Sequence, residues 1–270
     1  MKFEKTWTGN WENAFRGLRH PFESYAKSDS DFGIAENDVW LDEIVNEVIE
    51  SYIQNWNDER IDPNKEEIEE KLFNNGILNW GGKASCNYAF IGANDLDLAQ
   101  RMIKAGTPND KFLRQIFVSV DITAPLYWWK EMDTYKVGTV ANSTSTMHKL
   151  ASTSITKDCF EMDDYEGSLK LFENYPYSLP EFVDDMWEEI IDICETLRKR
   201  YLETKDIRYW KELIRFLPES WLQTRTWTAN YSTLRNIIHW RKGHKLTEWK
   251  AFLDWAETLP YADDLLFFEN

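Results

Sequence analysis

The sequence has few cysteines, no paired-cysteine motif and no long apolar run. Cys86, Cys159 and Cys194 are odd in number and far apart. This excludes a disulfide framework and a cysteine zinc site, and it favours a reducing compartment. No stretch reaches the roughly 18 apolar residues of a membrane span, and the opening residues carry no apolar signal segment. These absences predict no membrane partner and, by default, a cytoplasmic location.

The chain also lacks a surplus of positive charge. Its 31 Lys and Arg residues face 47 Asp and Glu residues, which gives a formal net charge of −16. Binding to nucleic acid or to an anionic lipid surface needs a basic face that replaces counterions, so neither partner is expected. A small anionic ligand is compatible with this charge, because local Arg and Lys side chains outweigh the global field at close range.

Apolar and aromatic side chains are abundant. The 270 residues are 43% hydrophobic and 15% aromatic, with 14 Trp, which is enough to bury a large core in a single domain. Most of these Trp residues are interpreted as anchors of the core or of a subunit interface. The alternative is that a few of them stack on a planar ligand.

Helical periodicity dominates the chain. Helices are expected over 41–56, 65–73, 95–105, 126–135, 179–201, 209–217, 230–241 and 247–258. The clearest strand is 115–121, where apolar and polar residues alternate over a β-branched run. Residues 1–35 are interpreted as mixed, with a basic and polar loop. Residues 137–146, rich in Thr and Ser, are interpreted as a loop near a binding surface.

Three motifs that resemble chemical sites are rejected. Residues 76–85 are similar to a phosphate loop, but the spacing is one residue off and Ala84 stands where Ser or Thr would ligate magnesium. His239 and His244 are five residues apart, whereas ligands on one helix face need a spacing of three or four. No metal is therefore expected. Without a serine nucleophile elbow, and with cysteines in apolar surroundings, neither Ser-His-Asp nor Cys-His catalysis is expected.

The best candidate for a pocket is built from residues 133–147 and 224–241. In the second stretch, polar residues recur through an apolar pattern, and Asn230 is expected to cap the helix that follows. At 100° per residue, Asn236 lies about 240° and Arg241 about 20° around the helix axis from Asn230. The residues alone leave two interpretations open, a ligand site or a helix cap with a solvated arginine.

Six positions near the second stretch follow one spaced pattern without a gap: Leu217-Pro218, Thr224-Arg225, Trp227-Thr228, Asn230, Asn236 and Arg241. This pattern resembles the last conserved block of the flavin-dependent thymidylate synthases. Residues 98–147 follow a second order of that family, a helix ending in glycine, a strand, Ala-Pro, an aromatic-rich helix and a polar loop. The opening segment with Arg16 and Arg19 is also similar to the family's start, which makes residues 31–90 a helical insertion. The resemblance implies a mainly helical α+β fold with a twisted sheet, as one domain spanning residues 1–270.

The polar loop departs from the family pattern. The family signature RHRxxSxNExSxRY aligns without gaps with residues 134–147, where Asn142 stands for Glu and Thr144 for the second Ser. Lys136 is the one cation that survives. Thr146 stands for an arginine, and this change removes a bidentate phosphate clamp. A further family arginine has Ile214 at its ungapped position, with Arg215 adjacent to it.

Carried over position by position, the resemblance implies two ligands. FAD is expected to contact Lys136, Asn142, Asn230 and Asn236. A pyrimidine nucleotide similar to dUMP is expected to contact Thr144, Ser145, Arg215 and Arg241, with Thr144 and Arg241 as catalytic positions.

The implied reaction is reductive methylation or a related nucleotide modification. NADPH and methylene tetrahydrofolate would be co-substrates, in a homotetramer whose sites form between subunits. The rewritten loop leaves a second hypothesis open, from a different class. It is a catalytically inactive descendant that binds a nucleotide or serves as a structural or assembly protein.

Overall fold

The strand expected from alternation is the best-defined part of the main sheet. In the computed structural model, β5 (Phe117–Pro125) buries Val118, Val120 and Ile122, while the residues between them stay partly accessible. This period of two is what a strand with one covered face requires. The expected strand at 115–121 is therefore confirmed, displaced toward the C-terminus.

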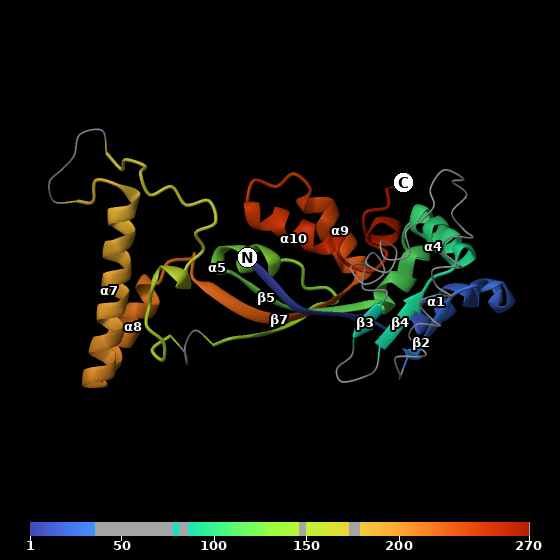
Figure 1. The fold of residues 1–270 in the computed structure, drawn as a ribbon, viewed down its shortest axis with the longest axis horizontal. Helices are drawn as coiled ribbons and strands as arrows, with labels where there is room; N and C mark the ends of the chain where they lie inside the picture. Colours follow the sequence, from blue (N-terminus) through green and yellow to red (C-terminus); the bar gives the residue numbers. More distant parts are fainter. Residues whose placement is uncertain (36–77, 81–85, 146–149, 173–178, 270) are drawn as a thin grey trace. The chain divides into compact units, whose positions relative to one another are not determined.

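Two sheets are present in the described residues (Figure 1). The larger has four strands in the order β1-β5-β7-β6, with β1 at Lys2–Gly9, β6 at Val140–Ser143 and β7 at Leu222–Asn230. The smaller is antiparallel in the order β2-β4-β3, with β2 at Asp31–Ala35, β3 at Leu78–Trp80 and β4 at Cys86–Phe90. Together with the helices these sheets confirm the expected α+β class.

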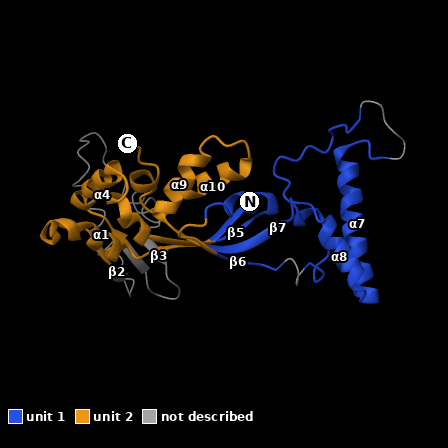
Figure 2. Ribbon diagram, turned by 180° about the vertical axis from the view of Figure 1, so that it is seen from behind, with its two compact units in different colours: residues 1–4, 121–135, 141–227 blue, residues 5–120, 136–140, 228–270 orange. Residues whose placement is uncertain are grey.

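The structure describes residues 1–35, 78–80, 86–145, 150–172 and 179–269. They form two compact units, coloured separately in Figure 2: unit 1 contains residues 1–4, 121–135 and 141–227, and unit 2 contains residues 5–120, 136–140 and 228–270. The helices expected over 41–56 and 65–73 lie outside the described residues, as does most of the rejected phosphate loop. The insertion at 31–90 and the single domain at 1–270 stay predictions.

Unit 2 contains three of the helices that periodicity predicted. These are α4 (Ala93–Ala105), α9 (Tyr231–Arg241) and α10 (Thr247–Glu257), close to the expected bounds. Tyr231 is completely buried at the start of α9; its ring meets Trp11 edge-on at 5.1 Å between centroids. Its hydroxyl donates to the Pro260 carbonyl at 2.8 Å, which satisfies the polar end of an otherwise apolar contact. Burial raises the pKa of the Tyr231 phenol.

The loop expected within the first 35 residues, over 14–33, is wrong at both of its ends, where α1 (Trp11–Arg19) and β2 form. The apolar residues of α1 fall at helical spacing and pack inward. At the end of α1 the Arg19 Nε donates to buried Asp95 at 2.6 Å. Ser28 and Ser30 also donate to Asp95. A buried ion pair of this kind cannot be recognised from local pattern, because its partners lie far apart in the sequence.

Two further segments form strands, although the sequence predicted no strand in either of them. β6 falls within the loop expected at 137–146, and β7 runs through the polar residues of 222–230. All four residues of β6 are exposed, so no apolar alternation marks it. Its extension is held instead by backbone pairing, where the Thr144 amide donates to the Thr224 carbonyl at 2.8 Å. Sheet partners far away in sequence override weak local preference here.

Unit 1 contains three helices and a second core. They are α5 (Leu126–Met132), α7 (Val183–Thr204) and α8 (Ile207–Phe216), which confirm the helices expected over 126–135, 179–201 and 209–217. The core beside α7 and α8 contains five buried residues, Leu150, Ile155, Phe160, Cys194 and Leu213. None of the helices in the described part of the chain is long and apolar enough to cross a membrane.

An ion pair on α7 fastens the segment after residue 150 to this core. Glu195 and Arg198 pair at 2.6 Å, with only 15% and 10% of their side chains exposed. Arg198 donates to the Ala151 carbonyl at 3.1 Å, and Glu195 accepts from the Ile155 amide at 2.9 Å. The Arg198 guanidinium lowers the pKa of Glu195 to about 2. The pair therefore ties a loop to a helix through the backbone groups of that loop.

We predict that Glu195→Gln lowers the free energy of unfolding by about 2 kcal/mol at neutral pH, because it leaves a buried guanidinium without its charge partner. The pKa of Glu195 is depressed in the folded state, so its stabilisation is present above its ordinary value of 4.5. That stabilisation is lost as pH falls toward 2. Denaturant titrations across this range measure the difference.

Glu203→Gln is the matched control, because Glu203 pairs with Arg200 at the same spacing on α7 but both side chains are more than half exposed. It should leave the free energy of unfolding nearly unchanged. Equal effects of the two substitutions would contradict the role assigned to Glu195.

Candidate functional site

The residues expected at the site divide between the two units. Lys136, Asn230, Asn236 and Arg241 belong to unit 2, whereas Asn142, Thr144, Ser145 and Arg215 belong to unit 1. Thr146, at the position of the lost arginine, lies outside the described residues.

In unit 2 the junction between β7 and α9 is organised by Asn230. This residue is buried and extended (φ −135°, ψ 165°), and its Oδ1 accepts the Thr233 amide at 2.9 Å. The expected helix cap is thus confirmed. Asn, Asp, Ser and Thr are favoured at this position because their side-chain oxygen replaces a missing intrahelical acceptor.

The same junction holds the start of the polar loop. Thr233 Oγ1 donates to the Val137 carbonyl at 3.0 Å. Gly138 has a φ of +73° and passes so close that a Cβ there would lie 2.6 Å from Asn230 Nδ2. These contacts fix residues 137–138 against the N-terminal end of α9. Lys136, directly before them, is exposed.

Further along α9, Asn236 and Arg241 take different surroundings. Asn236 is exposed, and its Oδ1 accepts from Trp240 Nε1 at 3.2 Å. The Arg241 guanidinium lies 4.4 Å from the ring centroid of Trp249, which is completely buried. Arg241 is thus not a solvated arginine; one face of its guanidinium packs against the core as a cation–π contact.

Arg225, from the same conserved-looking block, is held in a similar way in unit 1. Its guanidinium lies 4.2 Å from the centroid of buried Trp129, and it pairs with Asp133 at 2.8 Å. Its Nε donates to Gln223 at 2.9 Å. Both arginines of the block therefore stack on buried indoles, a role that residue spacing alone did not suggest.

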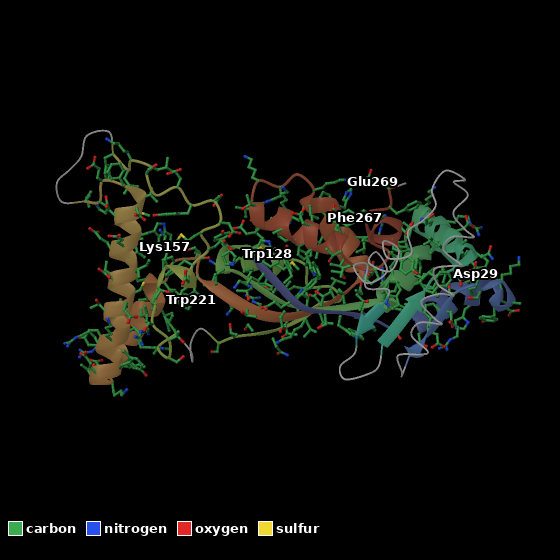
Figure 3. The ribbon with its side chains drawn as sticks, in the orientation of Figure 1. Asp29, Trp128, Lys157, Trp221, Phe267 and Glu269 are labelled. Atoms are coloured by element: carbon green, nitrogen blue, oxygen red, sulfur yellow. The ribbon has the colours of Figure 1, made fainter. Side chains whose placement is uncertain are left out.

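Unit 1 contains a cavity of about 660 Å³ that two of the expected nucleotide residues line. Thr144 and Ser145 form one side, and the Thr144 carbonyl accepts from Gln223 Nε2 at 3.0 Å. Aromatic and charged residues complete the wall; Trp221 and Lys157 are labelled in Figure 3. Arg215 does not line the cavity; it is exposed on α8 and pairs with Glu212. Asn142 is exposed on β6.

The segment 150–163 supplies much of this cavity and carried no signal in the sequence. Leu150, Thr153, Lys157 and Cys159 line it, and Phe160 meets Trp221 edge-on at 5.5 Å between ring centroids. Cys159 is half-buried; it packs against the core of unit 1 and also lines the cavity, so the expectation of apolar surroundings for the cysteines holds only in part at this position. It holds for Cys194, where burial raises the pKa of the thiol to about 11.

A charge pattern in the sequence marks the second stretch more clearly than its motif spacing. Although the chain has 47 Asp and Glu residues, none occurs between Glu219 and Glu248, a segment that contains Arg225, Arg235, Arg241, Lys242 and Lys245. This acid-free segment is locally basic in a chain of net charge −16. Such a segment lowers the electrostatic cost of holding an anion there.

The groups in unit 2 fit FAD in chemical type. A dinucleotide needs a cation beside its pyrophosphate, amide donors for its ring edges and apolar surface for its planar rings. Lys136 supplies an exposed ammonium, Asn236 an exposed amide and Trp240 an indole that is 66% exposed. Asn230 is buried, its Oδ1 is used as the helix cap and Gly138 lies against its amide nitrogen, so it serves this surface by holding residues 137–138 in place.

Comparison with known sequences gives no match for this chain, whereas comparison with solved structures does. No protein-family model and no curated protein matches the chain. The flavin-dependent thymidylate synthase of Helicobacter pylori, solved with FAD and dUMP, matches with a TM-score of 0.56 and 13% identity, over 99% of this chain and 98% of that one. A second structure of that enzyme with FAD and dUMP gives the same values. At this identity the likeness establishes a shared fold.

We predict that Gly138→Ala lowers the free energy of unfolding by about 1–2 kcal/mol more than Gly243→Ala. Both glycines have nearly the same positive φ, +73° and +74°, but a Cβ at Gly243 meets nothing within 4 Å. The excess comes from the collision with Asn230, whose side chain cannot turn away without losing its cap.

A double-mutant cycle tests this cause. In an Asn230→Ala background, itself costing roughly 1 kcal/mol for the lost cap, the excess at Gly138 should disappear. If the two substitutions are additive in denaturant titrations, the close approach of Gly138 to Asn230 is not the reason.

Proposed function

We propose that this chain is a divergent flavin-dependent thymidylate synthase-like protein, which binds FAD and a pyrimidine nucleotide similar to dUMP. The observation that carries the proposal is the shared fold, which extends over 99% of the chain. It is supported by the ungapped pattern from Leu217 to Arg241 and by the cavity at Thr144 and Ser145. The proposed reaction is reductive methylation or a related modification of the nucleotide.

The proposed cofactor residues are Lys136, Asn142, Asn230 and Asn236. Lys136 pairs with a phosphate of FAD, the amides of Asn142 and Asn236 donate to its ring edges or phosphates, and Asn230 positions the loop that carries Lys136. When bound, FAD supplies the hydride of the reaction. The protein contributes orientation and electrostatics, beginning with the fixed position of residues 137–138 beside α9.

The proposed nucleotide residues are Thr144, Ser145, Arg215 and Arg241. Thr144 and Ser145 offer hydroxyl groups at the cavity, and the Thr144 backbone is held from both sides by Thr224 and Gln223. Thr144 and Arg241 are the proposed catalytic positions. NADPH and methylene tetrahydrofolate are the proposed co-substrates, in a cytoplasmic homotetramer.

The number and the packing of the cations in these stretches favour a second function. Arg225 and Arg241 stack on buried indoles, and the signature loop keeps Lys136 alone among its family's cations. These features suit a descendant that binds a nucleotide without catalysis or serves as a structural or assembly protein. The two functions differ in whether a bound flavin is reduced.

Flavin binding and reduction provide the deciding measurement. The purified protein should show a flavin absorption spectrum, either as isolated or after addition of FAD, and NADPH should bleach it. Lys136→Ala should weaken FAD binding by about tenfold or more, because a charge-assisted contact to phosphate is lost. Titration calorimetry measures this change.

Lys130→Ala is the control, since Lys130 is an exposed lysine on α5 that pairs with Glu219; its FAD affinity should match that of the unaltered protein. A colourless protein that takes up no FAD would contradict the proposed function. Uptake of FAD without reduction by NADPH would favour the inactive descendant.

Occupation of the cavity by the nucleotide can be followed through Cys159. At dUMP concentrations about ten times the dissociation constant, alkylation of Cys159 by iodoacetamide should slow about tenfold, because only the empty protein reacts. Mass spectrometry of the labelled peptides gives the rate.

Cys194 is completely buried and acts as an internal reference. AMP, a purine nucleotide with the same phosphate, should protect Cys159 far less than dUMP does. An unchanged rate under saturating dUMP would place the nucleotide elsewhere.

A further inference from the structure

Trp240 is the most exposed tryptophan among those whose side chains the structure describes. Trp128, Trp129 and Trp249 are at most 1% exposed, whereas Trp240 is 66% exposed near the end of α9. Trp7 on β1 is 49% exposed. An indole left in water forgoes the burial that stabilises the others, so its exposure calls for a binding partner or another role.

The indole of Trp240 is held by one edge. Its Nε1 donates to Asn236 Oδ1 at 3.2 Å, one helical turn earlier, and its ring meets His239 edge-on at 5.0 Å between centroids. A hydrogen bond at the edge restricts rotation of the ring while it leaves a face accessible. An aromatic ring oriented in this way loses little conformational freedom when a second ring stacks on it.

The same helix face carries the groups already described for unit 2. Thr233, Asn236 and Trp240 follow one another at spacings of three and four, so they share one side of α9. Thr233 holds Val137, which is 89% exposed and directly follows Lys136. The surface thus combines an indole, an apolar side chain, an amide and a cation within the acid-free segment and its attached loop. This combination suits a planar ring that is joined to an anionic group.

We infer that Trp240 is the platform on which a planar ring of the bound cofactor stacks, with Asn236 positioning the indole. The inference rests on the proposed binding of FAD. The isoalloxazine and adenine rings of FAD are both flat heteroaromatic systems, and either one provides the shared chemistry. The ligand arms of the experiment separate them.

Three variants test the inference by binding alone. Trp240→Ala should weaken FAD binding by about tenfold or more, and Trp240→Phe by about threefold, since a smaller ring keeps part of the stacking. Trp7→Ala, at the other exposed indole of unit 2, should leave the affinity unchanged. Titration calorimetry and near-ultraviolet circular dichroism give affinity and folding for each variant.

Riboflavin and AMP identify the stacked ring. If Trp240→Ala weakens riboflavin binding, the isoalloxazine lies on Trp240; if it weakens AMP binding instead, the adenine does. Either result supports the platform. Unaltered FAD affinity in Trp240→Ala would overturn it, while the proposed function would stand.

Two other outcomes also overturn the inference. If Trp240→Ala splits an assembled protein into smaller species by light scattering, without a change in FAD affinity, the indole is a subunit contact. If the unaltered protein binds none of the three ligands, the proposed function itself fails and the platform fails with it.

Discussion

The side chain of Asn230 is the constraint on which much of unit 2 depends. It ends β7, caps α9 through the Thr233 amide and leaves room at its amide nitrogen only for a glycine, at position 138. One short polar side chain therefore sets the direction of a helix and the path of a loop. The exposed residues of that loop and helix, Lys136 and Asn236, owe their positions to this junction.

Unit 1 shows the same use of a buried polar group to place a loop. Glu195 and Arg198 bind backbone groups of the segment 151–155, and that segment leads into the wall of the cavity. A buried ion pair contributes little to stability unless further contacts offset the cost of removing its charges from water. Here both charges also bind backbone groups. The segment that leads into the cavity wall is thus attached to α7 by the long-range hydrogen bonds of this ion pair, outside any motif.

Arg225 and Arg241 have a packing role that would be compatible with an altered site on the same fold. Arg225 and Arg241 occupy positions of the family pattern, and each stacks on a buried indole. Their conserved-looking spacing is then compatible with packing as well as with ligand binding. The segment that surrounds Arg241 contains no Asp or Glu in an acidic protein, which is why an anionic ligand is still the proposal for this surface.

The sequence by itself determined the helices α4, α5, α7, α8, α9 and α10, the strand β5 and the cap at Asn230, because periodicity and capping act within a few neighbouring residues. The α+β class followed from the resemblance of its spaced residues to a known family. Tertiary structure alone decided α1 with its buried Arg19, the exposed strand β6 and the cavity lined by residues from 144 to 163. The burial of Arg19 depends on its ion pair with Asp95, and the extension of β6 depends on its pairing with β7. These partners lie far away along the chain, so folding brings them together in a way that no local pattern expresses.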